Sequence, residues 1–173
     1  MKDRAGQHRA FLGGAIILVG IVAMTVGCSY SFKSTLPEHV KTLSIGVFDN
    51  ETMEIGLEGK VSDKIVEEFA LDGRVKVSDY TPDARLEGKI VKYDKRAINY
   101  GSDDGVYEFR MNIEVEFSCK DLKTGENLAG PMPMKTSLDY QVFGSLASSE
   151  KDAQEELAGE LAKEIVHEVL MGW

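Results

Sequence analysis

Cys28 is the residue whose position suggests covalent chemistry. It directly follows Gly27, at the end of an uncharged apolar run over residues 10–27, and a basic head over residues 2–9 precedes that run. A charged head, an apolar stretch and a small residue before the cut are the parts of a secretory signal. A cysteine at the cut allows the new N-terminus to carry a diacylated thiol and an acylated amine. We therefore predict a signal peptide over residues 1–27 and lipidation at Cys28.

An uncleaved signal anchor is the alternative for this segment. The apolar run approaches the roughly 20 residues that span a bilayer, and Thr25 stands where lipoprotein signals usually carry Leu or Val. Lipidation is preferred because Cys28 lies where the apolar run ends. Two or more acyl chains hold a protein stably at a membrane, whereas one holds it only marginally. Membrane attachment is therefore expected through the acyl anchor.

The rest of the chain offers little catalytic chemistry. Cys119 would be the one remaining cysteine, so neither a disulfide framework nor a cysteine-based metal site is expected. His39 and His167 lie far apart and have no neighbouring ligand pattern. No nucleophile elbow, phosphate-binding glycine loop or zinc-protease motif occurs in the sequence. We expect a protein that is not an enzyme and that binds no cofactor or metal.

The charge of the chain excludes further partners. The whole sequence has a net charge of −9, and the part after residue 27 keeps 17 basic and 28 acidic side chains. Proteins that follow phosphate backbones carry a basic stripe, so nucleic acid is not expected as a partner. The same acidity disfavours electrostatic attachment to anionic lipid heads, which leaves attachment to the acyl chains.

The elements that follow Cys28 predict a tether and one domain. Residues 28–39 would form the lipidated N-terminus and a short tether, and residues 40–173 a single domain. An alternating row begins the domain as a strand, and a polar turn over residues 49–52 ends it, with Asn and Asp side chains bonding local amides. That row is Leu43, Ile45 and Val47.

An amphipathic helix is predicted from Gly56 to Gly73, where glycine supplies the left-handed residue after the last turn. Its apolar positions are Leu57, Val61, Ile65 and Phe69, with Val66 and Ala70 beside them. A second helix begins near residue 149 with a capping box from Ser149 to Asp152 and carries a wide apolar stripe.

Two long strands and an edge strand lie between the helices. Residues 84–98 alternate, residues 101–105 form a hairpin tip, and residues 107–119 alternate without a break. The last row predicts a half-buried central strand in which Cys119 is a buried small hydrophobe. Pro131 and Pro133 remove N–H donors from one side of residues 128–140, which predicts an edge strand. The fold class is therefore α+β, a two-layer sandwich with two helices on one face of a mixed, mostly antiparallel sheet.

An ordered set of segments across the chain after residue 27 resembles the lipopolysaccharide (LPS)-assembly lipoprotein family LptE. The segments are Gly27-Cys28-Ser29-Tyr30-Ser31-Phe32, Leu36-Pro37-Glu38-His39-Val40, Phe48-Asp49-Asn50-Glu51-Thr52, Phe69-Ala70-Leu71-Asp72-Gly73-Arg74, Ala84-Arg85-Leu86-Glu87-Gly88, Asp121-Leu122-Lys123-Thr124-Gly125 and the closing Gly172-Trp173. The fold of that family, helices against a mixed sheet, agrees with the pattern of the elements.

The resemblance implies a non-catalytic subunit of the outer-membrane LPS translocon. Such a lipoprotein plugs the β-barrel protein LptD, helps it assemble and binds LPS. Ser29, in place of Asp, resembles the sorting context for the outer membrane. The expected location is thus the periplasmic side of the outer membrane, through the lipid anchor.

The residues for LPS binding are also implied by the resemblance, since the family uses basic residues near the hairpin tip and the start of the last helix. Here the tip is acidic, with Asp103 and Asp104. The candidates are Lys95, Arg96 and Lys151, for which ordinary surface charge is the alternative interpretation.

A lipoprotein regulator of a periplasmic enzyme, such as a peptidoglycan synthase, is the second function that the sequence allows. These proteins share a lipidated cysteine, a tether and a strand that ends near an Asn-x-Thr turn. Their tethers are usually long, whereas residues 29–39 reach only about 40 Å when fully extended. That short reach favours the barrel partner.

Overall fold

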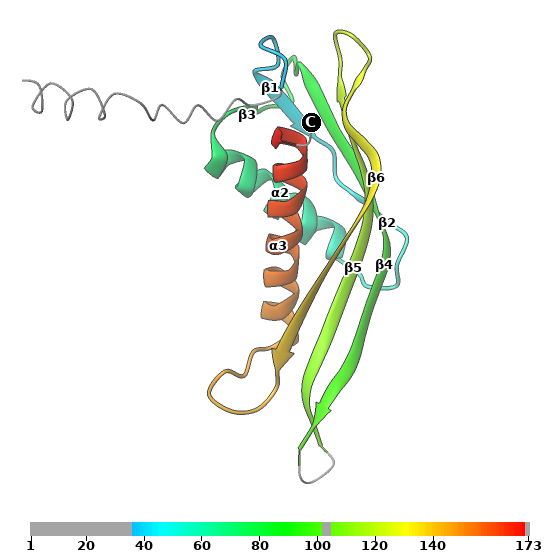
Figure 1. Cartoon of the computed structure of the whole chain (residues 1–173), viewed down its shortest axis with the longest axis vertical. Helices are drawn as coiled ribbons and strands as arrows, with labels where there is room; N and C mark the ends of the chain where they lie inside the picture. The colour runs from blue at the N-terminus through cyan, green and yellow to red at the C-terminus, as the bar shows by residue number, and fades with distance from the viewer. Residues whose placement is uncertain (1–35, 102–104, 172–173) are drawn as a thin grey trace, which may run out of the picture. The chain divides into compact units, whose positions relative to one another are not determined.

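Two helices pack on one face of a six-stranded mixed sheet in the computed structural model, which describes residues 36–101 and 105–171 (Figure 1). This confirms the predicted α+β two-layer fold class. In chain order the elements are β1 (Thr42–Ile45), β2 (Asp49–Asn50), α2 (Leu57–Asp72), β3 (Lys76–Val77), β4 (Ala84–Tyr100), β5 (Val106–Asp121), β6 (Asn127–Gln141) and α3 (Glu150–Met171). The predicted signal peptide, Cys28 and most of the tether lie outside the described residues.

The sheet has the strand order β3-β1-β4-β5-β6, and β2 pairs with β4 after β1 has ended. β1 is parallel to β3 and β4, whereas β4, β5 and β6 form two long antiparallel pairs. β6 is an edge strand, and Pro131 and Pro133 lie in its first half. Because proline has no N–H to donate, an edge is the place where β6 can accommodate both. The edge-strand prediction is confirmed.

Local hydrogen bonds explain the end of α2 and the start of α3. The helix α2 ends at Gly73, which has a φ of 73° and donates its N–H to the carbonyl of Phe69 at 3.1 Å. At the start of α3, the N–H of Asp152 donates to Ser149 Oγ at 3.1 Å, and the same hydroxyl donates to the Asp152 carboxylate at 2.7 Å. The predicted cap of each helix is therefore confirmed.

The core lies between the helices and the covered face of the sheet. Alternate residues of β5 are 2% exposed or less: Met111, Ile113, Val115, Phe117 and Cys119. They face the buried stripe of α3, which includes Leu157, Leu161 and Ile165. Burial raises the pKa of Cys119 to about 12, so its thiol stays protonated and behaves as the small hydrophobe that the pattern predicted.

The first strand and the first helix differ in detail from the predicted rows. Val47 is 73% exposed, because β1 ends at Ile45 and the chain re-enters the sheet as β2. Phe48 is buried instead, and its ring lies against the backbone of Gly88.

In α2, the expected apolar neighbours Val66 and Ala70 are exposed, and Ser62 is buried in their place. Its hydroxyl donates to the Glu58 carbonyl and accepts the N–H of Phe48 at 2.9 Å. The buried face of α2 thus includes a serine because its hydroxyl is hydrogen-bonded, which the pattern of apolar residues did not predict.

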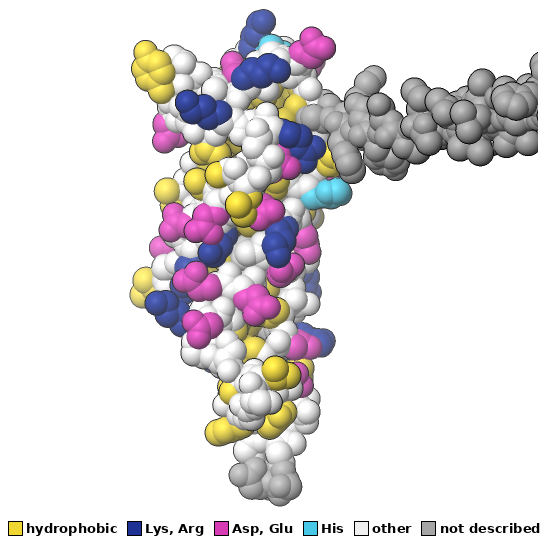
Figure 2. Space-filling view, turned by 90° about the vertical axis from the view of Figure 1, so that its left-hand side faces the viewer, with side chains coloured by type: hydrophobic (Ala, Val, Ile, Leu, Met, Phe, Trp, Pro, Cys, Tyr) yellow, Lys and Arg dark blue, Asp and Glu magenta, His cyan; other side chains and the backbone are white. Residues whose placement is uncertain are grey.

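Acidic and basic side chains are interleaved over the outer face of the helix layer, with some exposed hydrophobic side chains among them (Figure 2). Ion pairs three residues apart, between Lys64 and Glu67 and between Lys163 and Glu160, contribute to this pattern at 2.7 Å each. Within the described residues, no helix is both long enough and apolar enough to cross a bilayer.

Candidate functional site

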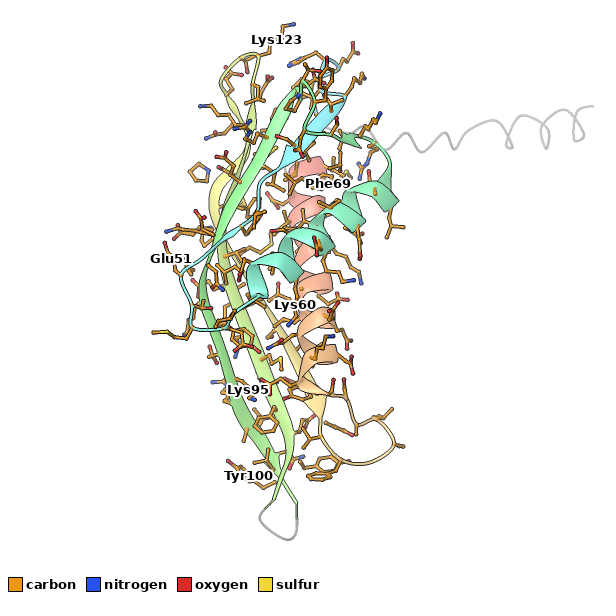
Figure 3. The ribbon with its side chains drawn as sticks, turned by 180° about the vertical axis from the view of Figure 1, so that it is seen from behind. Glu51, Lys60, Phe69, Lys95, Tyr100 and Lys123 are labelled. Atoms are coloured by element: carbon orange, nitrogen blue, oxygen red, sulfur yellow. The ribbon has the colours of Figure 1, made fainter. Side chains whose placement is uncertain are left out.

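Lys95 lies where the start of α3 meets the sheet (Figure 3). It is in register with Met111 of β5, so its side chain lies on the face of the sheet that the helices cover. Its ammonium group is 2.6 Å from a carboxylate oxygen of Glu150, the first residue of α3. This hydrogen bond raises the pKa of Lys95 and outweighs its partial burial.

An aromatic pair lies beneath the Lys95 amine. The amine is 5.2 Å from the centroid of the Phe109 ring, within the range of a cation–π contact. Phe109 stacks on Tyr140 with 5.7 Å between the ring centroids, because the two residues are in register on β5 and β6. We refer to Lys95, Phe109, Tyr140 and Glu150 as the Lys95 cluster. A cation beside apolar rings can contact a molecule that carries both an anionic group and hydrocarbon.

A buried amide joins this region to α2. The side chain of Gln154 on α3 is nearly inaccessible, and its amide donates to Glu54 at 2.7 Å and to the hydroxyl of Tyr93 at 3.2 Å. Lys60 of α2 donates to the amide oxygen of Gln154. We call Glu54, Lys60, Tyr93 and Gln154 the Gln154 network. It holds the segment before α2, both helices and β4 together.

The other two predicted LPS contacts do not join Lys95 in one cluster. Arg96 is in register with Arg110, on the face of the sheet away from the helices. Arg110 in turn makes two contacts of 2.6 Å with Asp139. Lys151 is exposed in the first turn of α3, next to the Glu150 that pairs with Lys95. The structure therefore brings Lys95 and Lys151 to one end of α3 and places Arg96 across the sheet. The hairpin tip, residues 102–104, lies outside the described residues.

The uncovered face of the sheet is polar and charged. Its middle rows carry charges of both signs on three strands: Lys92, Asp94 and Arg96 on β4, Arg110, Asn112 and Glu114 on β5, and Lys135, Ser137 and Asp139 on β6. Asn112 donates to Asp94 at 3.0 Å. Such a face remains compatible with water or with a polar wall.

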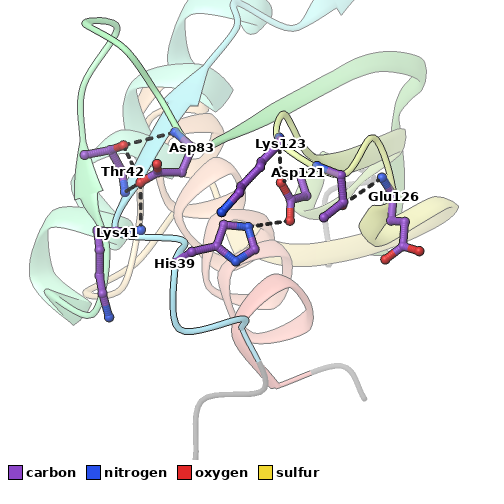
Figure 4. A network of polar contacts seen from close by, with 8 residues as sticks. His39, Lys41, Thr42, Asp83, Asp121, Lys123 and Glu126 are labelled. Carbon is purple, nitrogen blue, oxygen red and sulfur yellow. Dashed lines mark hydrogen bonds and ion pairs between the residues drawn. The ribbon is translucent and has the colours of Figure 1, made fainter.

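A second polar cluster fixes the entry of the chain into the sheet (Figure 4). Nε2 of His39 is 2.7 Å from Asp121, whose carboxylate is buried and also accepts the N–H groups of Lys123 and Thr124. Burial alone would raise the pKa of Asp121, but these hydrogen bonds outweigh it and hold the pKa below its ordinary value of 3.8. No partner for His39 could be predicted from the sequence, because Asp121 lies 82 residues away.

Asp83 completes this entry point from the start of β4. Its carboxylate accepts the N–H groups of Lys41 and Thr42 at 2.9 Å and the hydroxyl of Thr42 at 2.8 Å. These bonds lower the pKa of Asp83.

In the described part of the chain, no group of three or more His, Cys, Asp or Glu side chains is placed to hold a metal ion.

A comparison with protein families assigns the described domain. The family of lipopolysaccharide-assembly proteins, LptE, matches residues 40–170, which include every helix and strand described above except the last residue of α3. The chain belongs to the LptE family. The resemblance drawn from the ordered segments is thereby confirmed, and membership in this family indicates a role in LPS assembly.

Solved structures share the fold of this LptE-family chain. An uncharacterised lipoprotein B from Nitrosomonas europaea is 15% identical, with a TM-score of 0.53, covering 84% of this chain and 91% of its own. A protein from Xanthomonas campestris is 13% identical, with a TM-score of 0.51, covering 79% of this chain and 87% of its own. Identities this low show the fold alone. Among curated proteins, no sequence matches the chain.

Proposed function

We propose that this LptE-family protein is the non-catalytic lipoprotein subunit of the outer-membrane LPS translocon. Acylation of Cys28 anchors it on the periplasmic side of the outer membrane, and it plugs an LptD-type β-barrel that it helps to assemble. The observation that carries this proposal is the family match over residues 40–170. No cofactor, metal ion or nucleic acid takes part.

The two surfaces of the domain support a place inside a barrel. The uncovered sheet face and the outer helix face both carry interleaved charges of both signs. The lumen of a wide outer-membrane barrel is polar, unlike its lipid-facing exterior. A domain whose two broad faces are largely polar can fill such a lumen without exposing large apolar surfaces to its water.

Direct contact with LPS is the finer part of the proposal. The Lys95 cluster offers a cation beside two aromatic rings, and Lys151 adds an exposed cation at the same end of α3. An LPS phosphate would compete with Glu150 for the Lys95 ammonium group. Arg96 would contact LPS only from the opposite face, so its effect should be independent of the other two.

Three single reversals test this contact: Lys95→Glu, Lys151→Glu and Arg96→Glu, each assayed for binding of purified LPS. The first two should weaken binding, and the double variant Lys95→Glu/Lys151→Glu should lose less than the sum of the two single losses, because both residues act on one site. Arg96→Glu tests the uncovered face separately. Unchanged binding in all three variants would remove direct LPS contact from the proposal.

The main test is affinity purification of the tagged, lipidated protein from detergent-solubilised outer membranes. A large β-barrel protein recovered in equal amount supports the plug role. A Cys28→Ala variant should be absent from the outer-membrane fraction, which tests the lipid anchor separately. Recovery of a peptidoglycan synthase, or of no partner, contradicts the barrel role, and the synthase would favour the enzyme regulator.

A further inference from the structure

The loop between β2 and α2, residues 51–56, presents large apolar side chains to solvent. Met53 is 100% exposed and Ile55 is 93% exposed, although the neighbouring Phe48 and Leu57 are both buried. We refer to residues 51–56 as the Met53 loop. It follows β2 and lies beside β4 (Figures 1 and 3). Burial of its two apolar side chains would be favourable, so their complete exposure is a feature to explain.

The Met53 loop is held in one conformation by side-chain hydrogen bonds. The Asn50 amide nitrogen donates to the Glu54 carbonyl at 2.7 Å and to the Glu58 carboxylate at 2.8 Å. The Asn50 amide oxygen accepts the N–H of Thr52 at 2.9 Å and its hydroxyl at 2.7 Å. The sequence predicted this turn chemistry, and the structure shows that one asparagine organises the whole loop.

A second anchor comes from the opposite side. The Glu54 carboxylate, between Met53 and Ile55, accepts the buried amide of Gln154 at 2.7 Å and so belongs to the Gln154 network. Glu54 therefore points inward while its two apolar neighbours point to solvent. A loop fixed at both ends loses little conformational entropy when it binds, which is the advantage of a preorganised contact.

The charges around the Met53 loop indicate which kind of molecule can bind it. Residues 49–60 contain four carboxylates, Asp49, Glu51, Glu54 and Glu58, and one lysine. Lys89 of β4 adds a second cation, 3.2 Å from Glu51, so the carboxylates around the loop still outnumber the ammonium groups. Glu54 and Glu58 are bound by the neutral amides of Gln154 and Asn50, so their negative charge is kept. An anionic lipid surface would be repelled by such a loop. A second copy of this chain is also disfavoured, because the copies share a strongly negative net charge.

We propose that the Met53 loop docks Met53 and Ile55 into an apolar pocket on a protein partner, with cationic side chains at the rim of the pocket. This inference rests on the proposed function, since the partner that carries the pocket is the barrel subunit. The rigid loop supplies the contact, and the carboxylates around it set its orientation.

The test compares three lipidated, tagged proteins purified from outer membranes: wild type, the double variant Met53→Ser/Ile55→Ser, and the control Leu71→Ser. Leu71 is 80% exposed on α2 and lies outside the Met53 loop. The double variant should recover at least about tenfold less barrel protein, since two apolar side chains lose their burial. Leu71→Ser should recover as much as the wild type. All three should unfold at the same temperature, because the altered side chains contact solvent.

Two outcomes separate this inference from the proposed function. If the wild type recovers the barrel protein and the double variant recovers it equally, the docking role of the Met53 loop is wrong and the proposed function stands. If the wild type recovers no barrel protein, both are wrong. A photo-crosslinking residue at position 53 gives a direct check. Crosslinks to the barrel support the inference, and crosslinks to a second copy or to lipid overturn it.

Discussion

The two faces of the strand β5 have opposite environments: one is buried and apolar, and the other is uncovered and charged. On the covered face, Met111, Ile113 and Val115 are fully buried beneath the helices. On the uncovered face, Arg110 and Glu114 lie opposite charged residues of both neighbouring strands. Because side chains alternate along a strand, one segment can serve both faces without compromise.

The side chains on the two faces contribute different amounts to the free energy of folding. A buried large apolar side chain contributes roughly 1.5–3 kcal/mol, whereas an exposed ion pair contributes about 0–1 kcal/mol. The covered face therefore determines whether the domain folds. The uncovered face is left free to match a partner, because its side chains can change with little effect on stability.

Ile113→Ala and Glu114→Ala, on adjacent residues of β5, compare the two faces directly. Ile113→Ala removes buried methyl groups and should lower the free energy of unfolding by about 2–5 kcal/mol. Glu114→Ala, on the other face, should change it by less than about 0.5 kcal/mol. Urea denaturation of both variants measures the difference. Equal effects would show that the uncovered face is also part of the core.

Gly88→Ala tests how closely the covered face is packed. A Cβ at Gly88 would overlap the ring of Phe48 and lie 2.9 Å from the carbonyl oxygen of Glu116. Overpacking of this kind should lower the free energy of unfolding by about 1–3 kcal/mol. Phe48→Leu in the Gly88→Ala background should restore part of that loss, because a smaller side chain makes room. Additive losses in the double variant would place the strain elsewhere.

Periodicity predicted most of the covered face, and it did so because burial is averaged over many residues. The row of β5 and the stripe of α3 each contain enough apolar positions that one deviation does not matter. Where an element is short, a single local feature determines which side chain is buried. Phe48 replaces Val47 in the core because the strand is interrupted between β1 and β2. Ser62 replaces Val66 because its hydroxyl accepts the N–H of Phe48.

The candidate site was less accessible to sequence reasoning. Lys95 and Lys151 lie near one another only because β4 and the start of α3 meet in space. Adjacent residues on a strand face opposite ways, so Lys95 and Arg96 could have been assigned to opposite faces from the strand alone. The partners of Lys95, namely Phe109 and Glu150, depend on strand register and helix placement, which the pattern does not fix. In contrast, Met53 and Ile55 stand out in the sequence as apolar residues within a polar turn.

Asp121 is a carboxylate on the covered side, and its behaviour with pH should differ from that of surface acids. Its folded pKa lies below 3.8, so its contribution to stability is complete above that pH and is lost as the pH falls through the folded pKa. Asp121→Asn should therefore be less stable than the wild type at pH 7, by less than Ile113→Ala. The gap should narrow below pH 3.8, as urea denaturation at pH 7 and pH 3 would show. A gap independent of pH would mean that the amide change, and not the charge, causes the loss.

The smallest effect is expected for the pair of Arg110 and Asp139 on the uncovered face. The two contacts of 2.6 Å lower the pKa of Asp139 and raise that of Arg110, yet both side chains are more than one-third exposed. Solvent and salt screen such a pair. A double-mutant cycle with Arg110→Ala and Asp139→Ala should give a coupling that is well below the Ile113→Ala effect and fades in 1 M salt. A coupling that persists in 1 M salt would show that this face is dehydrated, and its charges would then stabilise the fold as the covered face does.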